Sequence, residues 1–209
     1  MAYYLGISGV LTNEQVLAEG VTPTTSKIFL VEWGEEQAQH SLGSEIERLT
    51  APVETLRQVT LVDTPGTNAL DRAHEALTTE FVPRADLVLF VTSADRPLSD
   101  SERVFLEAVR GWGKKVVLVV NKVDILHGDR EIAEVMTYVT SNAARLLGTE
   151  PESFAVSALR AMEAQDTGDR EALAASGLPE VESFLRTTLD SGELLRLKLG
   201  NPLGVADHL

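Results

Sequence analysis

Short apolar runs rich in valine and leucine alternate along this chain with longer segments in which apolar residues recur at helical spacing. The runs at 86–92 and 115–121 are nearly continuous in Val and Leu, as expected for strands covered on both faces. The predicted strands are residues 27–33, 59–63, 86–92, 115–121 and 153–158. The predicted helices are residues 68–80, 99–112, 130–147 and 176–189. This alternation predicts an α/β fold, a doubly wound and mainly parallel sheet with helices on both faces.

The composition then narrows the class of protein. The chain has 209 residues, of which 44% are apolar and 24% charged, as in an ordinary soluble domain. Its 32 acidic and 18 basic side chains give a formal charge of −14, which would repel a phosphate backbone, so nucleic acid is not expected as a partner. It contains no cysteine, which excludes thiolate metal sites and is typical of a reducing cytoplasm. We therefore expect one cytoplasmic domain over residues 1–209, with residues 163–177 as a polar surface excursion.

In a parallel sheet of this type, ligands bind beyond the carboxyl ends of the strands. Asp63 ends one predicted strand and is followed by Thr-Pro-Gly. A carboxylate there can hold a hydrated Mg²⁺, and Gly66 can offer its backbone N–H to a terminal phosphate without a Cβ in the way. The alternative is that Asp-Thr-Pro-Gly simply forms a turn after a strand.

A second polar group, Asn-Lys-Val-Asp, follows the predicted strand 115–121. An aspartate beyond a strand end can accept two hydrogen bonds from the N1–H and N2–H₂ edge of guanine, which adenine does not offer. By this interpretation Asp124 reads the base, the stem of Lys122 lies across the purine face and Asn121 ties neighbouring loops together. The alternative is a solvated turn with unrelated charges. Three residue types at this spacing directly after a strand favour the functional interpretation.

The last predicted strand ends in Ser157, Ala158 and Leu159. Small residues in such a turn allow a backbone N–H to approach the carbonyl of the base, which adds to selectivity for guanine. Ser-Ala-Leu is common, so its weight comes from its position after the other two motifs.

These three motifs, in this order, resemble those of the P-loop GTPases. Residues 16–34 are similar to the first switch of bacterial dynamin-like GTPases, and residues 56–70 are similar to their second switch. The resemblance covers residues 14–209, with 192–209 similar to the start of the exit toward a helical bundle that this chain does not contain. In that family a threonine after the Thr-Pro turn binds Mg²⁺ and senses the γ-phosphate. The candidates here are Thr22, Thr24 and Thr25, and Thr25 is the one we choose.

The resemblance implies GTP and GDP as ligands and Mg²⁺ as cofactor. It assigns Thr25 and Asp63 to the metal, and Thr25 and Gly66 to catalysis. It assigns nucleotide binding to Asn121, Lys122, Asp124, Ser157, Ala158 and Leu159. It also implies self-association through the nucleotide face, and membrane contact only through parts outside this chain.

One family motif is absent from the sequence. The phosphate-binding string G-x-x-x-x-G-K-[ST] does not occur, and the chain begins about where that loop should end. In the family, the strand before this loop lies between the strands predicted at 59–63 and 86–92. We expect residues 2–7 to stand in as a short central strand. The alternatives are a strand from a second chain or a missing segment, or a rearranged sheet.

The sequence also differs from that of small signalling GTPases at the residue that positions the attacking water. Small signalling GTPases place a glutamine directly after Asp-x-x-Gly, where this chain has Thr67. Dynamin-like proteins also lack it, and the resemblance implies that they activate water by pairing two GTPase domains, with a monovalent cation and groups from the phosphate loop. We therefore expect little hydrolysis by this chain alone. Two functions remain open: a GTPase domain coupled to membrane remodelling, or a nucleotide-free module of the same fold that binds proteins.

Overall fold

The computed structural model describes residues 27–44, 46–57, 59–64 and 81–189. The chain divides into two compact units, Met1–Phe81 and Val82–Leu209, which are described separately below. The expectation of one GTPase-like domain over residues 1–209 stays a prediction. The predicted strand at 2–7 and the predicted helix at 68–80 lie outside the described residues.

The second unit is built on a parallel sheet with strand order β5-β6-β7. Its strands are β5 (Leu87–Ser93), β6 (Lys115–Asn121) and β7 (Glu152–Val156). The central strand β6 is buried from Val116 onward, as its run of valines predicts for a strand covered on both faces. The three predicted strands of this unit are therefore confirmed, and so is the α/β fold class.

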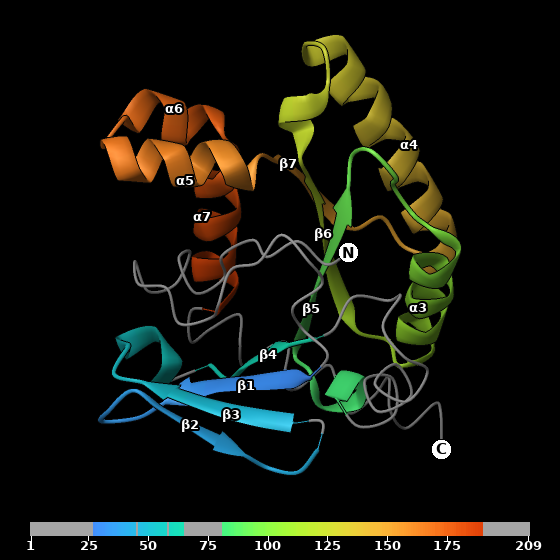
Figure 1. Cartoon of the computed structure of the whole chain (residues 1–209). Coiled ribbons are helices and arrows are strands. Elements are labelled where there is room, and N and C mark those ends of the chain that lie inside the picture. The colour runs from blue at the N-terminus through green and yellow to red at the C-terminus, as the bar shows by residue number, and fades with distance from the viewer. Residues whose placement is uncertain (1–26, 45, 58, 65–80, 190–209) are drawn as a thin grey trace. The chain divides into compact units, whose positions relative to one another are not determined.

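Helices cover both faces of this sheet. Figure 1 shows α3 and α4 side by side on one face and α7 on the other. The helices of this unit are α3 (Asp100–Gly111), α4 (Asp129–Leu147), α5 (Ala158–Thr167), α6 (Arg170–Ala175) and α7 (Leu178–Leu189). Leu106 and Val109 of α3 and Val139 of α4 are fully buried and pack with β6 in one apolar core. Helix α3 begins as predicted, because Glu102 Oε2 accepts a 2.7 Å hydrogen bond from the Ser99 N–H.

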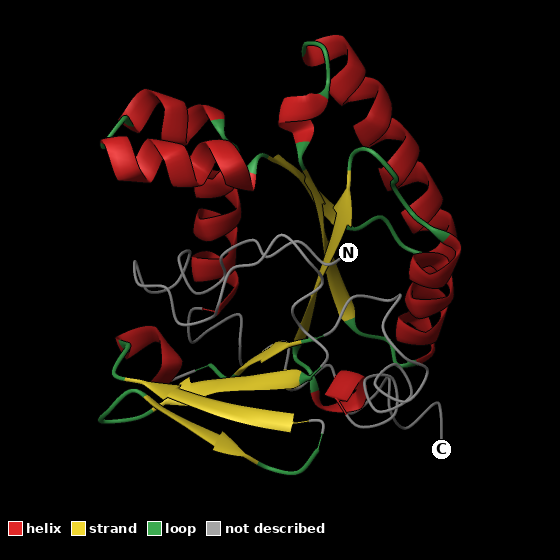
Figure 2. Ribbon diagram, viewed as in Figure 1, coloured by secondary structure: helices red, strands yellow, loops and turns green. Residues whose placement is uncertain are grey.

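The first unit contains a mixed sheet with strand order β2-β3-β1-β4 (Figure 2). Strands β1 and β3 are parallel, whereas β1 and β4, and β2 and β3, are antiparallel. The strands are β1 (Ile28–Trp33), β2 (Ala38–Ser41), β3 (Ile46–Ala51) and β4 (Leu61–Asp63). Val31, Leu49 and Leu56 form the centre of its small core, with Leu56 supplied by the 3₁₀ turn η1 (Glu54–Arg57).

Strands β2 and β3 were not predicted: β2 is short and mostly exposed, and β3 contains a buried acid. Glu47 lies on the same face of β3 as Leu49 and Ala51, all three below a tenth exposed, so β3 shows no simple apolar–polar alternation. The charge is tolerated because Lys27 Nζ donates a 2.6 Å hydrogen bond to Glu47 Oε1. This bond, with others from β2, holds the pKa of the Glu47 carboxyl below its ordinary value against the opposing effect of burial.

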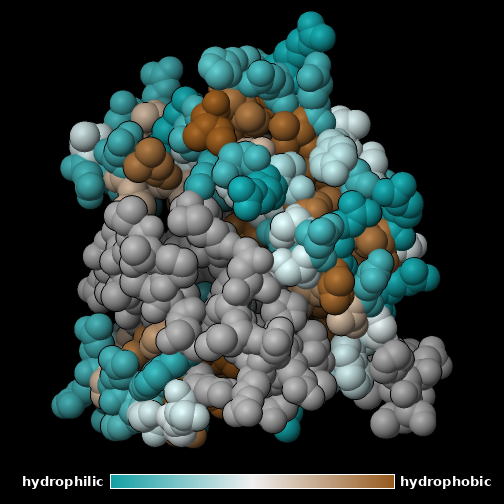
Figure 3. All heavy atoms as spheres, turned by 45° about the vertical axis from the view of Figure 1, so that its right-hand side comes forward, coloured by the Kyte–Doolittle hydropathy of each residue, from teal (hydrophilic) through white to brown (hydrophobic). Residues whose placement is uncertain are grey.

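The stretch 163–177 is on the surface, as expected, but it is helical rather than irregular. It forms the end of α5 and all of α6, and only Ala164 and Ser176 in it are buried. Its alanines, glutamates and leucine are good helix formers, so exposure alone did not indicate a loop. Over the described residues, the face seen in Figure 3 is mainly hydrophilic with smaller hydrophobic areas. No described helix is long and apolar enough to cross a membrane.

Candidate nucleotide site

The three parallel strands of the second unit end level with one another. Ser93 of β5 pairs with Asn121 of β6, and Asn121 pairs with Val156 of β7. The segments that follow these residues therefore all leave the sheet at the carboxyl ends of its strands, which is where ligands bind in open α/β sheets.

Asn121 joins two of these segments. Its side chain is 2% exposed, and its Oδ1 accepts hydrogen bonds from the Lys122 N–H at 2.7 Å and the Ala158 N–H at 3.0 Å. Its backbone carbonyl accepts a 2.8 Å bond from the Ala94 N–H beyond β5. Asn121 thus connects the ends of all three strands, which is the geometry expected of a residue that ties loops together.

Lys122 turns the chain sharply away from β6. It adopts a left-handed conformation with φ 64°, which costs a non-glycine residue about 1–2 kcal/mol. The hydrogen bond from its N–H to Asn121 helps to offset that strain. Its ammonium group lies 3.8 Å from Asp95 Oδ1, with the Lys122 side chain 25% exposed. The end of the lysine side chain therefore lies near the segment that follows β5.

Asp124 and Ser157, which follow the neighbouring strands β6 and β7, are joined by a hydrogen bond. Asp124 lies in the 3₁₀ turn η4 (Val123–Ile125), and its Oδ1 accepts a 2.6 Å hydrogen bond from Ser157 Oγ. Ser157 is 1% exposed and also caps α5, because its Oγ accepts a 3.2 Å bond from the Arg160 N–H. A half-buried carboxylate is thus fixed at the rim by a buried hydroxyl.

Asp95 is a site residue that the sequence analysis missed. Ser93 Oγ donates a hydrogen bond to its Oδ1, and Lys122 lies near the same oxygen. Ser93 and, less strongly, Lys122 hold the pKa of the Asp95 carboxyl below its ordinary value, although partial burial opposes them. A usable signal was present, because Asp95 follows β5 as Asp124 follows β6.

Ala158 and Leu159 open helix α5. The Ala158 N–H is engaged with Asn121, and the Leu159 N–H lies in the first turn, where no preceding helical carbonyl is available to accept it. The Leu159 side chain is 57% exposed at this rim. The first turn of α5 therefore offers a backbone donor next to Asp124 and Ser157.

The residues predicted to serve Mg²⁺ and the γ-phosphate belong to the first unit. Asp63 ends β4, as predicted, and is half-buried. Thr22, Thr24, Thr25 and Gly66 lie outside the described residues. In the part of the chain that the structure describes, no group of three acidic or histidine side chains is close enough to hold a metal.

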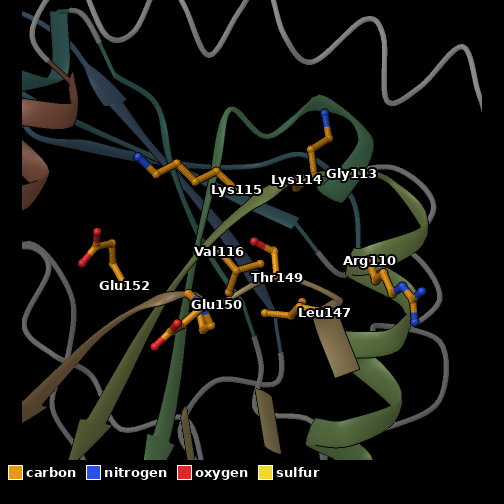
Figure 4. A pocket seen from close by; sticks show the side chains of 10 residues that line it. Arg110, Gly113, Lys114, Lys115, Val116, Leu147, Thr149, Glu150 and Glu152 are labelled. Carbon is orange, nitrogen blue, oxygen red and sulfur yellow. The ribbon is translucent and has the colours of Figure 1, made fainter. Parts of the chain in front are cut away.

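A cavity of about 350 Å³ lies at the other end of the second unit's sheet, where β6 and β7 begin (Figure 4). Arg110 and Lys115 line it, but their side chains extend in different directions. Helices α3 and α4 end beside it, and the carbonyl groups at helix C-termini disfavour anions. This cavity is therefore a poor site for a nucleotide.

The chain is similar to known proteins of the dynamin family. A model of the dynamin family matches residues 36–123. A protein of Arabidopsis thaliana named as a probable transmembrane GTPase FZO-like, chloroplastic, is 38% identical over 231 residues, which span 97% of this chain and 25% of that protein. Dynamin-like protein A of Bacillus subtilis is 28% identical over 114 residues, covering 52% of this chain and 9% of that protein.

The fold has a counterpart among solved structures. One chain of an oligomerised bacterial dynamin pair, described as providing a mechanism for sensing and tethering membranes, superposes with a TM-score of 0.75 at 17% identity. The match covers 99% of this chain and 40% of that one, so this chain spans less than half of each of these relatives. With the family model, the Arabidopsis relative and the shared fold in agreement, the chain belongs to the dynamin-like GTPases.

Proposed function

We propose that this chain is the guanine-nucleotide-binding domain of a dynamin-like GTPase that hydrolyses GTP to GDP and phosphate. The observation that carries the proposal is the pair of contacts that join β6 to the start of α5. Asn121 holds the Ala158 N–H, and Ser157 holds the Asp124 carboxylate. Together they place an acceptor and a backbone donor at one rim.

Each of these groups has a part in base recognition. Asp124 accepts from the N1–H and N2–H₂ groups of guanine, using the carboxylate that Ser157 orients. The Lys122 stem covers one face of the purine. The Leu159 N–H donates to the base carbonyl, since the Ala158 N–H is already engaged. Adenine lacks the edge that Asp124 reads, so the site selects guanine.

We also propose that the nucleotide binds together with Mg²⁺. A half-buried carboxylate at the end of β4 fits this role, because Mg²⁺ in nucleotide sites is held by one or two protein oxygens, water and phosphate. We assign the ion to Asp63 and Thr25, and the sensing of the γ-phosphate to Thr25 and Gly66. When bound, the ion would neutralise charge on the phosphates.

Further parts of the proposal concern the whole protein. We propose that pairing of two such domains through the nucleotide face activates hydrolysis, and that hydrolysis is coupled to membrane remodelling. The names of the relatives support this, since one is called a transmembrane GTPase and another structure an oligomerised dynamin pair that tethers membranes. We place this domain in the cytoplasm, with membrane contact made by parts outside these residues.

The proposed hydrolysis by this 209-residue chain alone is slow, because it contains no G-x-x-x-x-G-K-[ST] string to cradle the phosphates. The alternative, a nucleotide-free protein-binding module, is not favoured. The Ser157–Asp124 and Ala158–Asn121 hydrogen bonds support the GTPase proposal, and relatives that match this chain are named as GTPases.

Calorimetric titration tests the proposal. The chain is titrated with GTP, GDP and ATP, with and without Mg²⁺, and phosphate release is followed separately. We expect GDP and GTP to bind and ATP to give no heat at the same concentrations. Binding of ATP equal to that of GTP, or no heat with any nucleotide, would contradict the proposed function.

A further inference from the structure

The turn between α6 and α7 is hydrogen-bonded to the backbone of Ser157. The Ser157 N–H donates a 2.8 Å hydrogen bond to the carbonyl of Ser176, which lies 19 positions further along the chain. The backbone of the guanine-reading turn is therefore held by a later segment as well as by its own strand and helix.

Ser176 is itself fixed on both sides. It is 1% exposed, and its Oγ donates to the Leu173 carbonyl at 2.6 Å and accepts from the Leu178 N–H at 3.2 Å. Its own N–H also donates to Leu173 O at 3.1 Å. These bonds connect the end of α6 to the start of α7 and leave the Ser176 carbonyl little freedom to move.

Gly177 allows this turn to lie against β7. It has φ +75°, and a Cβ at this position would lie 2.1 Å from the Ala155 carbonyl oxygen. Ala155 lies on β7, two residues before Ser157. Any side chain at 177 would push the turn off the strand and remove Ser176 O from the Ser157 N–H.

We infer that Ser176 and Gly177 are positioning residues for guanine recognition, setting the place of Ser157 and through it the orientation of the Asp124 carboxylate. The inference rests on the proposed function, because it concerns how that same site selects its base. It adds residues that lie outside all three nucleotide motifs. If the turn moves away, Ser157 loses its backbone acceptor and its hydroxyl no longer holds Asp124 in place.

The test compares Gly177→Ala with Gly168→Ala in the full chain. Gly168, the C-cap of α5, has a similar φ of +71°, but a Cβ there would meet nothing within 4 Å. Both variants carry the strain of alanine in the left-handed region, and only Gly177→Ala also displaces a neighbour. The two readouts are hydrogen exchange of the Ser157 amide without ligand, and the ratio of the dissociation constants for IDP and GDP.

Inosine lacks the 2-amino group that Asp124 reads, so this ratio reports the orientation of the carboxylate. We expect Gly177→Ala to lower the preference for GDP over IDP by about tenfold, since an unmade buried hydrogen bond discriminates strongly. The same variant should lose protection of the Ser157 amide. Gly168→Ala should keep the preference for GDP over IDP and the protection of the Ser157 amide that the unchanged chain shows.

A second variant covers the case in which Gly177→Ala does not fold. Ser176→Ala removes the hydroxyl bonds to Leu173 and Leu178 and should lower the preference about threefold. If every folded variant still binds GDP with an unchanged preference over IDP, the inference is wrong while the proposed function stands. If the unchanged chain binds no guanine nucleotide, the proposed function fails and this inference fails with it.

Discussion

The hydroxyl of Ser157 donates a 2.6 Å hydrogen bond to Oδ1 of Asp124, although the two residues are 33 positions apart. The bond becomes possible because β6 and β7 are parallel neighbours whose ends are level. Ser157 is nearly inaccessible whereas Asp124 is half-buried, so the buried hydroxyl orients a carboxylate that a ligand can still reach. This relationship leads to the first prediction, about the base that the site selects.

Asp124→Asn is expected to change the preferred base from guanine to xanthine. The carboxylate accepts from two N–H groups of guanine, whereas an amide also donates, and xanthine has a carbonyl where guanine has its amino group. We expect GDP to bind at least about tenfold more weakly and XDP more tightly than to the unchanged chain, since the loss of a hydrogen bond to a charged group is worth about 1.5–3 kcal/mol. Competition titrations with GDP and XDP measure this.

Asp129→Asn is the matched control for that substitution. Asp129 is an exposed acid in the first turn of α4, so its neutralisation makes the same change of net charge. The control should keep the preference for GDP. If Asp124→Asn also keeps it, Asp124 does not read the base.

Asn121→Ala is expected to destabilise the second unit whether or not nucleotide is bound. Its Oδ1 accepts from the N–H groups of Lys122 and Ala158, and both would lose this acceptor in a partly buried place. Each unsatisfied group costs about 1–3 kcal/mol, so we expect the free energy of unfolding to fall by about 2–4 kcal/mol. Urea denaturation followed by circular dichroism measures the loss.

The control is Asn142→Ala, also an asparagine-to-alanine change. Asn142 lies on α4, where it donates to the Tyr138 carbonyl one turn earlier and accepts from Arg145, and both hydrogen bonds are exposed. This control should change stability by less than about 0.5 kcal/mol, as is usual for surface positions. Equal losses in the two variants would show that Asn121 does not hold the loops together.

The sequence was sufficient to predict the strands that form continuous apolar runs. The predicted run at 115–121 coincides with β6, because a strand covered on both faces must be apolar throughout. It was not sufficient for β3, since Glu47 occupies a buried position that becomes acceptable through its contacts with Lys27 and with β2. A local pattern does not contain such a contact.

In the candidate site, too, some residues could be predicted from the sequence and others could not. Asn121, Asp124 and Ser157 were selected from their motifs and from their positions after predicted strands. The structure joins Asp124 to Ser157 and Asn121 to Ala158. The position of Asp95 after a strand could have selected it, but its contact with Lys122 depends on β5 lying beside β6, and a sequence does not state the order of strands in a sheet. The support of Ser157 by Ser176 was missed for the same reason, since it depends on where the turn after α6 packs.

Gly34→Ala is expected to destabilise the first unit. Gly34 follows β1 and its N–H donates a 3.1 Å hydrogen bond to the Ala51 carbonyl, which brings it close to β3. An added Cβ would lie 2.6 Å from Thr50 Cβ, so one strand must shift. We expect a loss of about 1–3 kcal/mol in the free energy of unfolding, the usual cost of overpacking.

A double-mutant cycle with Thr50→Gly tests the cause of that loss. Removal of the Thr50 side chain clears the space that the new Cβ needs, so Gly34→Ala should cost less in that background. We expect a coupling energy of at least about 1 kcal/mol, in the range typical of residues in contact. Additive effects would show that the contact with Thr50 is not responsible.

The Asp95 carboxylate is expected to make stability depend on pH in the acid range. Its hydrogen bond from Ser93 and the nearby Lys122 lower its pKa in the folded protein below the ordinary value of 3.8. A lowered pKa means that the charged form stabilises the fold above pH 3.8, and that this stabilisation is lost as the pH falls through the folded-state pKa. Since the side chain is 52% exposed, we expect the effect at pH 7 to be below about 1 kcal/mol.

Asp95→Asn removes this titration and allows the measurement. The difference in free energy of unfolding between the unchanged chain and the variant should be largest near pH 7 and should shrink below about pH 4, as urea denaturation at pH 7 and pH 3 would show. Asp166→Asn, on the exposed surface of α5, makes the same charge change away from Lys122 and should give a smaller dependence on pH. A difference that grows as the pH falls would mean that Asp95 is destabilising when charged, and that its contact with Lys122 does not hold the lysine over the base.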